Sequence, residues 1–93
     1  MLVGVPTEVK DHEFRVALTP ANAHEYVARG NQVLIQAGAG TGSGFTDAEY
    51  IEAGAEIAPD ARRVFAAADM ILKVKEPVEA EYDLLRPGQI LFT

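Results

Sequence analysis

The stretch Leu2-Val3-Gly4-Val5-Pro6-Thr7-Glu8 decides the fold expected for this chain. Its first four residues form a short apolar run that Pro6 closes, which predicts a buried strand leading into a polar loop. The loop continues to Thr19-Pro20, where a threonine N-cap and a proline at the first helical position predict the start of a helix. The chain therefore opens with a strand, a long loop and a helix.

The same alternation continues along the chain. Further strands are predicted at 33–35, 56–57, 70–75 and 89–93, and helices after Thr19, from Thr46 to Gly54, over 61–67 and over 77–85. Alternating strands and helices indicate a parallel sheet, and continuous apolar runs at 33–35 and 90–92 suit strands buried on both faces. We expect an α/β fold, a Rossmann-like or flavodoxin-like three-layer parallel sheet with helices on both faces. We expect it to be incomplete at the C-terminus, because the sequence stops on an apolar strand with no covering helix.

The composition excludes several classes of protein. Ninety-three residues, 48% of them hydrophobic, suit one globular domain. The formal net charge of −6 disfavours binding to nucleic acid or to an anionic membrane surface. The sequence has no cysteine, which excludes a disulfide framework and fits a cytoplasmic protein. It also has no apolar run of about 18–20 residues for a membrane span, no signal peptide pattern and no metal-ligand spacing.

Two basic residues are predicted to meet at one edge of the sheet. Ligands of open α/β sheets bind outside the carboxyl ends of the strands, where the first loop carries Arg15 and the strand at 70–75 ends in Lys75. Arg15 can clamp a small carboxylate or phosphate with two parallel hydrogen bonds, or pair internally with Glu8 or Glu13. Lys75 can neutralise the same carboxylate or polarise a carbonyl oxygen, or lie solvated at a strand end.

Other polar residues are expected to have structural roles. His12 and His24 can transfer protons in principle, but we expect them to be exposed or structural. If 70–75 is a strand, Lys73 and Lys75 share a face, with one in the pocket and the other at solvent or a partner, and Glu76 is expected to form an ion pair or to place its charge at a helix N-terminus rather than to act as a base. A solvated face is expected for 79–81, and core positions for Tyr26, Tyr50 and Tyr82. The glycines at 38, 40, 42 and 44 do not follow the G-x-G-x-x-G spacing of a dinucleotide site. We expect that loop to form tight turns and to pack against another domain or subunit.

Several motifs carry a family resemblance. Gly4-Val5-Pro6-x-Glu8 and Glu13-x-Arg15-Val16-Ala17-x-Thr19-Pro20 resemble the N-terminal signature of alanine dehydrogenases and of the related NAD(P) transhydrogenase α-subunits. The resemblance continues through residues 38–45, 53–57, 73–77 and 91–93. Lys75-Glu76-Pro77 and Gly42-Ser43-Gly44-Phe45 are closer to the dehydrogenase branch. His12 and Asn22 depart from the usual pattern without removing a ligand-binding residue.

The resemblance implies a function for the chain. It implies NAD-dependent, reversible conversion of L-alanine to pyruvate, with Arg15 on the substrate carboxylate and Lys75 near the keto or amino centre. It also implies that residues 1–93 form the first part of the substrate domain. The family's catalytic histidine and aspartate and its nucleotide-binding domain then lie beyond Thr93, so the isolated chain is expected to be inactive. The resemblance further implies a homo-oligomer, often a hexamer. The alternatives are a transhydrogenase α-subunit segment or a non-catalytic association module with Arg15 and Lys75 in ion pairs.

Overall fold

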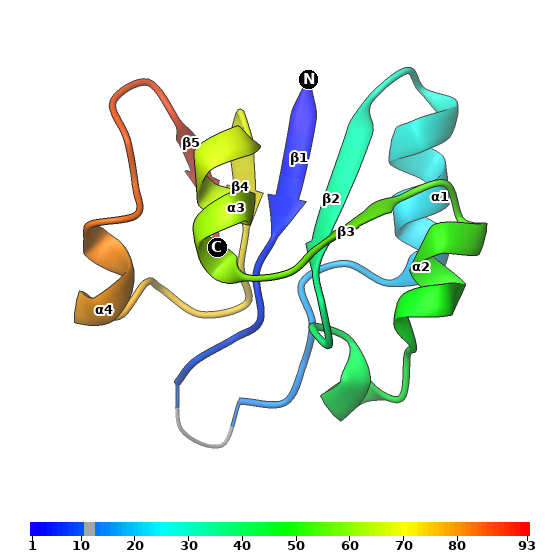
Figure 1. The fold of residues 1–93 in the computed structure, drawn as a ribbon, viewed down its shortest axis with the longest axis horizontal. Coiled ribbons are helices and arrows are strands. Elements are labelled where there is room, and N and C mark those ends of the chain that lie inside the picture. The colour runs from blue at the N-terminus through cyan, green and yellow to red at the C-terminus, as the bar shows by residue number, and fades with distance from the viewer. Residues whose placement is uncertain (11–12) are drawn as a thin grey trace.

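The molecule is built on one parallel sheet of five strands in the order β3-β2-β1-β4-β5 (Figure 1). The computed structural model describes residues 1–10 and 13–93, so the expectation for His12 lies outside the described residues. The strands are β1 (Leu2–Val5), β2 (Gln32–Gln36), β3 (Glu56–Ala58), β4 (Met70–Leu72) and β5 (Ile90–Phe92). All four pairings are parallel, which confirms the predicted α/β class. The strand order is that of the Rossmann type.

Helices cover both faces of this sheet. They are α1 (Pro20–Ala28), α2 (Asp47–Glu52), α3 (Ala61–Ala67) and α4 (Glu79–Tyr82), with a 3-10 turn η1 (Thr41–Ser43) before α2. One core joins α1 and α2 to the sheet, and it includes Val3, Val5, Val33, Ile35 and Tyr50. A second core joins α3 to the opposite face, and it includes Ala58, Val64, Phe65 and Ile71. The two cores make the three layers that the sequence predicts.

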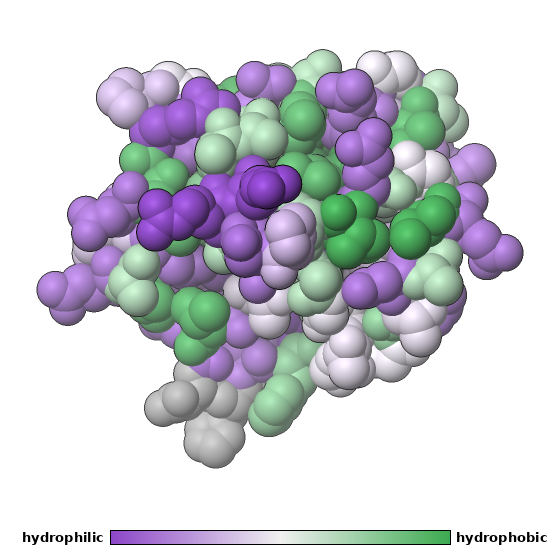
Figure 2. All heavy atoms as spheres, in the orientation of Figure 1, coloured by the Kyte–Doolittle hydropathy of each residue, from purple (hydrophilic) through white to green (hydrophobic). Residues whose placement is uncertain are grey.

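Gly4 allows α3 to lie close against β1. A Cβ atom at this position would lie 2.7 Å from Cβ of Ala68 and 2.8 Å from Cγ1 of Val64. A larger residue would therefore push the helix away from the central strand. On its outer side α3 is polar: strongly hydrophilic side chains gather over the helix, and the apolar groups of that face are separate from one another (Figure 2).

Three of the four predicted helix starts are confirmed, and the fourth helix begins at Glu79 rather than at Pro77. Thr19 caps α1 by accepting a hydrogen bond from Asn22 N, Thr46 and Glu49 form a capping box on α2, and Asp60 caps α3. These caps satisfy backbone N–H groups that have no partner inside the helix. None of the helices in the described ranges is long and apolar enough to span a membrane.

Some predictions about the last third of the chain are wrong. β4 ends at Leu72 rather than at Lys75, and α4 covers only four residues of the predicted 77–85. Tyr82 is 57% exposed rather than in the core. β5 is exposed at all three positions, although its apolar run predicted burial on both faces. It lies at the edge of the sheet beside β4, so its apolar side chains reach the surface.

Candidate functional site

The candidate site lies where the strand order reverses. From β1 the chain proceeds outward through β2 and β3, then crosses back to place β4 on the other side of β1. In open α/β sheets, ligands bind in the crevice outside the carboxyl ends of the strands at such a switch point. The segments that leave β1 and β4 begin at Pro6 and Lys73, and they carry the polar residues of interest.

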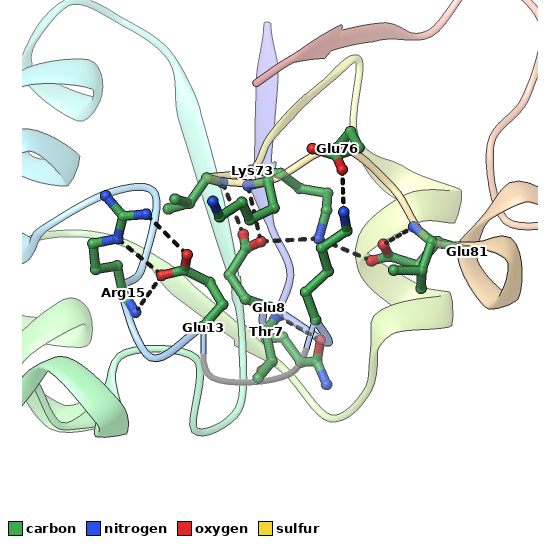
Figure 3. A network of polar contacts seen from close by, with 12 residues as sticks. Thr7, Glu8, Glu13, Arg15, Lys73, Glu76 and Glu81 are labelled. Carbon is green, nitrogen blue, oxygen red and sulfur yellow. Dashed lines mark hydrogen bonds and ion pairs between the residues drawn. The ribbon is translucent and has the colours of Figure 1, made fainter.

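Glu8 joins these two segments (Figure 3). Its Oε2 accepts a hydrogen bond of 2.9 Å from Val74 N, and its Oε1 accepts one of 3.2 Å from Lys75 N. The same Oε1 accepts a bond of 3.2 Å from the Lys73 ammonium. The carboxylate thus occupies backbone N–H groups that a neighbouring strand would otherwise bind, which explains why β4 stops at Leu72.

Lys73 is the centre of a buried ion cluster. Its Nζ lies 3.2 Å from Oε1 of Glu8 and 3.1 Å from Oε2 of Glu81, and the three side chains are only 1%, 2% and 5% exposed. Glu81 is also bonded through Oε1 to the N–H of Val78. The expectation of a solvated face is therefore wrong for Glu81. Lys73 and Lys75 also do not share a strand face, because β4 ends at Leu72, and Lys73 is buried whereas Lys75 is exposed.

Arg15 forms its internal ion pair with Glu13. In the guanidinium, Nε donates a hydrogen bond of 2.9 Å to Oε2 of Glu13, and Nη2 donates one of 2.9 Å to Oε1. The backbone N–H of Arg15 donates a further bond of 3.0 Å to Oε2 of Glu13. The Arg15 side chain is 69% exposed, whereas that of Glu13 is 6% exposed. These bonds hold the pKa of Glu13 at about 2 and raise that of Arg15. Nη1, at the outward end of this largely exposed side chain, makes no hydrogen bond to a residue of the ranges 1–10 and 13–93.

Lys75 lies at the same edge as this pair. It is exposed, and its charge contributes to the lowered pKa of both Glu13 and Glu76, after the larger effects of Arg15 on the first and Lys10 on the second. Glu76 forms an ion pair with Lys10, as predicted. The sequence-predicted pair of Arg15 and Lys75 is therefore brought to one edge, whereas Lys73 is buried beneath it.

Two clefts share Arg15 as a wall. The larger, of about 650 Å³, lies between the segment from Arg15 to Thr19, α1 and the ends of β4 and β5. The smaller, of about 320 Å³, lies between the loop after β1 and the glycine loop, and Glu8 and Glu13 line it. An acceptor that enters either cleft can therefore meet the guanidinium of Arg15.

The glycine loop packs against its own chain. A Cβ at Gly40 would lie 2.7 Å from the Tyr50 ring, and one at Gly42 would lie 2.7 Å from the Phe14 carbonyl oxygen. These contacts account for Gly40 and Gly42 within this chain, and the 3-10 turn η1 confirms the predicted tight turns, whereas packing of the loop against another domain or subunit stays a prediction. Because the glycines lack the G-x-G-x-x-G spacing of a dinucleotide site, we assign no NAD chemistry to them.

Sequence reasoning missed three supporting residues. Glu8 and Glu81 hold Lys73, and Ser43 Oγ accepts a bond of 3.2 Å from the N–H of Val16 and donates one of 3.1 Å to the carbonyl of Phe14. Ser43 thus secures the backbone on both sides of Arg15. The motif positions of Glu8 and Ser43 were visible in the sequence, but their partners lie 65–67 and 27–29 residues away.

Comparisons with known proteins identify the family of the chain. The family model described as "Alanine dehydrogenase/PNT, N-terminal domain" matches residues 4–93. The whole chain is 60% identical to an alanine dehydrogenase of Mycobacterium tuberculosis and 48% identical to one of Bacillus subtilis, and it spans 25% and 24% of those proteins. The chain thus spans about a quarter of the length of the curated relatives.

Solved structures extend the comparison to the fold. A structure of L-alanine dehydrogenase matches 98% of this chain and 25% of its own length, with a TM-score of 0.95 and 45% identity. A transhydrogenase from Sinorhizobium meliloti matches 98% of this chain and 27% of its own, with a TM-score of 0.90 and 34% identity. With a family match over nearly all of its residues, the chain belongs to the alanine dehydrogenase/PNT N-terminal domain family.

Proposed function

We propose that this chain is the N-terminal part of the substrate domain of an NAD-dependent L-alanine dehydrogenase located in the cytoplasm. The observation that carries the proposal is the presence of two exposed cations, Arg15 and Lys75, at the switch-point edge of the sheet. The curated relatives support the dehydrogenase branch, because those named alanine dehydrogenase are 48–60% identical. The matched transhydrogenase structure is 34% identical.

The two cations have different parts in the proposed reaction, in which L-alanine, NAD⁺ and water give pyruvate, ammonium, NADH and a proton. Arg15 binds the substrate carboxylate through the outward end of its guanidinium. Glu13 meanwhile holds the Nε–Nη2 edge and fixes the orientation of the group. Lys75 lies near the keto or amino centre of the substrate, where its ammonium stabilises negative charge on the substrate's keto oxygen. NAD, held by a domain outside these 93 residues, supplies the hydride acceptor when it is bound.

In this proposal the residues of this chain bind and orient the substrate, and the proton-transfer groups come from outside residues 1–93. The family resemblance places a histidine and an aspartate for that step beyond Thr93. The purified 93-residue chain is therefore expected to produce no NADH from L-alanine and NAD⁺. Turnover by the isolated chain would contradict this division of roles.

The experiment that tests the proposal replaces Arg15 by alanine in the intact enzyme. Loss of a charge-assisted pair weakens pyruvate binding by about 10- to 100-fold, whereas NADH binding remains unchanged. Arg62→Ala is the matched control, because Arg62 is an exposed arginine on α3, the helix on the opposite face of the sheet from α1. Equal weakening of pyruvate and NADH by Arg15→Ala would show that the arginine is structural.

The same protein separates the alternative functions. Oxidation of NADH that requires pyruvate and ammonium identifies the dehydrogenase, and transfer of hydride between nucleotides without pyruvate identifies the transhydrogenase. A protein that neither binds pyruvate nor transfers hydride between nucleotides is a non-catalytic module.

We extend the proposal to a homo-oligomer, of which a hexamer is the form that the resemblance implies. Light scattering of the intact protein tests this part, and a monomer would contradict it.

A further inference from the structure

We propose that Glu8 is a positioning residue that fixes Lys75 at the substrate edge. This inference rests on the proposed function, in which Lys75 contacts the substrate. Glu8 itself lies beneath the surface, since its side chain is 2% exposed, and it does not need to touch the substrate. Its role is to hold the backbone that carries the lysine.

The hydrogen bonds of Glu8 hold two successive peptide units, one on each side of the Val74 Cα. Oε2 accepts from Val74 N and Oε1 from Lys75 N, at 2.9 Å and 3.2 Å. Two successive N–H groups bound by one carboxylate fix both the position and the direction of the segment after β4. The second of these N–H groups belongs to Lys75 itself, so Glu8 anchors the backbone of Lys75 to the loop after β1. The same loop leads on to Arg15.

The carboxylate of Glu8 is itself held firmly. The preceding Pro6 is fully buried, and the N–H of Thr7 donates a hydrogen bond of 2.8 Å to Oε1 of Gln36 at the end of β2. On its other side the ammonium of Lys73 contacts Oε1 of Glu8, while Glu81 holds that ammonium from behind. Through Glu8 and its neighbours, the segment of Lys75 is therefore bonded to residues that adjoin three strands, β1, β2 and β4.

The arrangement requires a carboxylate rather than an amide. Both oxygens of Glu8 accept from donors, namely two backbone N–H groups and the Lys73 ammonium. Glutamine has one acceptor oxygen, so its NH₂ group must face either Val74 N–H or the ammonium together with Lys75 N–H. Either orientation removes at least one of the two bonds that fix the segment.

The test compares Glu8→Gln with Glu81→Gln in the intact enzyme. Both changes are isosteric and remove one carboxylate charge from the same buried cluster, but only Glu8 bonds to the Lys75 segment. We expect Glu8→Gln to raise the KM for pyruvate about 10- to 100-fold, as small misplacements of a binding group do, with the KM for NADH unchanged. Glu81→Gln, which removes no hydrogen bond to Val74 or Lys75, raises the KM for pyruvate much less than Glu8→Gln does, although both variants unfold at lower temperature.

A double-mutant cycle shows whether Glu8 acts through Lys75. In a Lys75→Ala background, Glu8→Gln should add no further loss of pyruvate binding. An additive loss, or equal KM changes in Glu8→Gln and Glu81→Gln, would overturn the inference. If Glu8→Gln does not fold, Glu8→Asp replaces it, because aspartate keeps the charge but is one methylene shorter. An unchanged KM for pyruvate in Glu8→Asp would again overturn the inference. An unchanged KM in Lys75→Ala alone would instead refute the proposed role of Lys75.

Discussion

Replacement of Lys73 by methionine tests the buried ion cluster most directly. Methionine has a similar length and keeps the apolar stem, but it leaves the carboxylates of Glu8 and Glu81 without their common cation. Removing one member of a buried ion pair costs about 3–5 kcal/mol, because the remaining charge stays out of water. A domain of this size has a free energy of unfolding of roughly 5–15 kcal/mol, so the variant loses a large part of its stability.

The two carboxylates do not suffer equally. Glu8 keeps its two backbone N–H donors, whereas Oε2 of Glu81 has no hydrogen bond within the described residues and depends on the ammonium 3.1 Å away. Adding Glu81→Gln to Lys73→Met removes the less well satisfied charge. The double variant should therefore regain about 1–3 kcal/mol relative to Lys73→Met alone.

Urea unfolding followed by far-ultraviolet circular dichroism measures these differences. With a slope of about 1–3 kcal/mol per molar urea, Lys73→Met lowers the midpoint by more than about 1 M. Lys10→Met is the matched control, because it breaks the exposed ion pair with Glu76 and should cost less than about 1 kcal/mol. If Lys73→Met were no more costly than Lys10→Met, the reasoning from burial would be refuted.

Two further predictions concern packing and pH. Gly4→Ala places a Cβ 2.7–2.8 Å from side-chain atoms of α3 and should cost about 1–3 kcal/mol in urea unfolding; a neutral effect would show that the helix moves freely. The Arg15 guanidinium lowers the pKa of Glu13 from 4.5, its ordinary value, to about 2 in the folded chain. The ion pair therefore stabilises the fold fully above pH 4.5, and this stabilisation is lost as the pH falls towards about 2. The stability difference between the unaltered chain and Glu13→Gln should therefore shrink between these two pH values, and a constant difference would contradict the pairing.

The local patterns of the sequence predicted the first two-thirds of the fold. Thr19-Pro20, Thr46 with Glu49, and Asp60 are short-range signals, because a cap and its N–H partner lie about three residues apart. The apolar runs of β1 and β2 are also local, and the parallel sheet follows from their alternation with helices. These features therefore appear in the structure where they were expected.

The errors arise where distant partners decide the outcome. Residues 73–75 look like the end of a strand, but Glu8, 66 and 67 positions earlier, accepts hydrogen bonds from the backbone N–H groups of Val74 and Lys75 and ends the ladder. Glu81 looks like a solvated residue beside Glu79, yet the Lys73 ammonium holds it inside, and Tyr82 is exposed instead. For Arg15 the sequence left two candidate partners open, and only the folded loop selected Glu13.

The Glu8 bridge has a consequence for the order in which the protein is made. Glu8 leaves the ribosome 67 residues before Lys75, a delay on the order of 3–13 s at typical synthesis rates of about 5–20 residues per second. Contacts of such long range close late in folding, so a nascent chain with Arg15 already paired to Glu13 has no anchored lysine. Only the completed sheet presents both cations together. A carboxylate ligand that needs both therefore favours the finished fold over its intermediates, and its binding reports that synthesis and folding of this segment are complete.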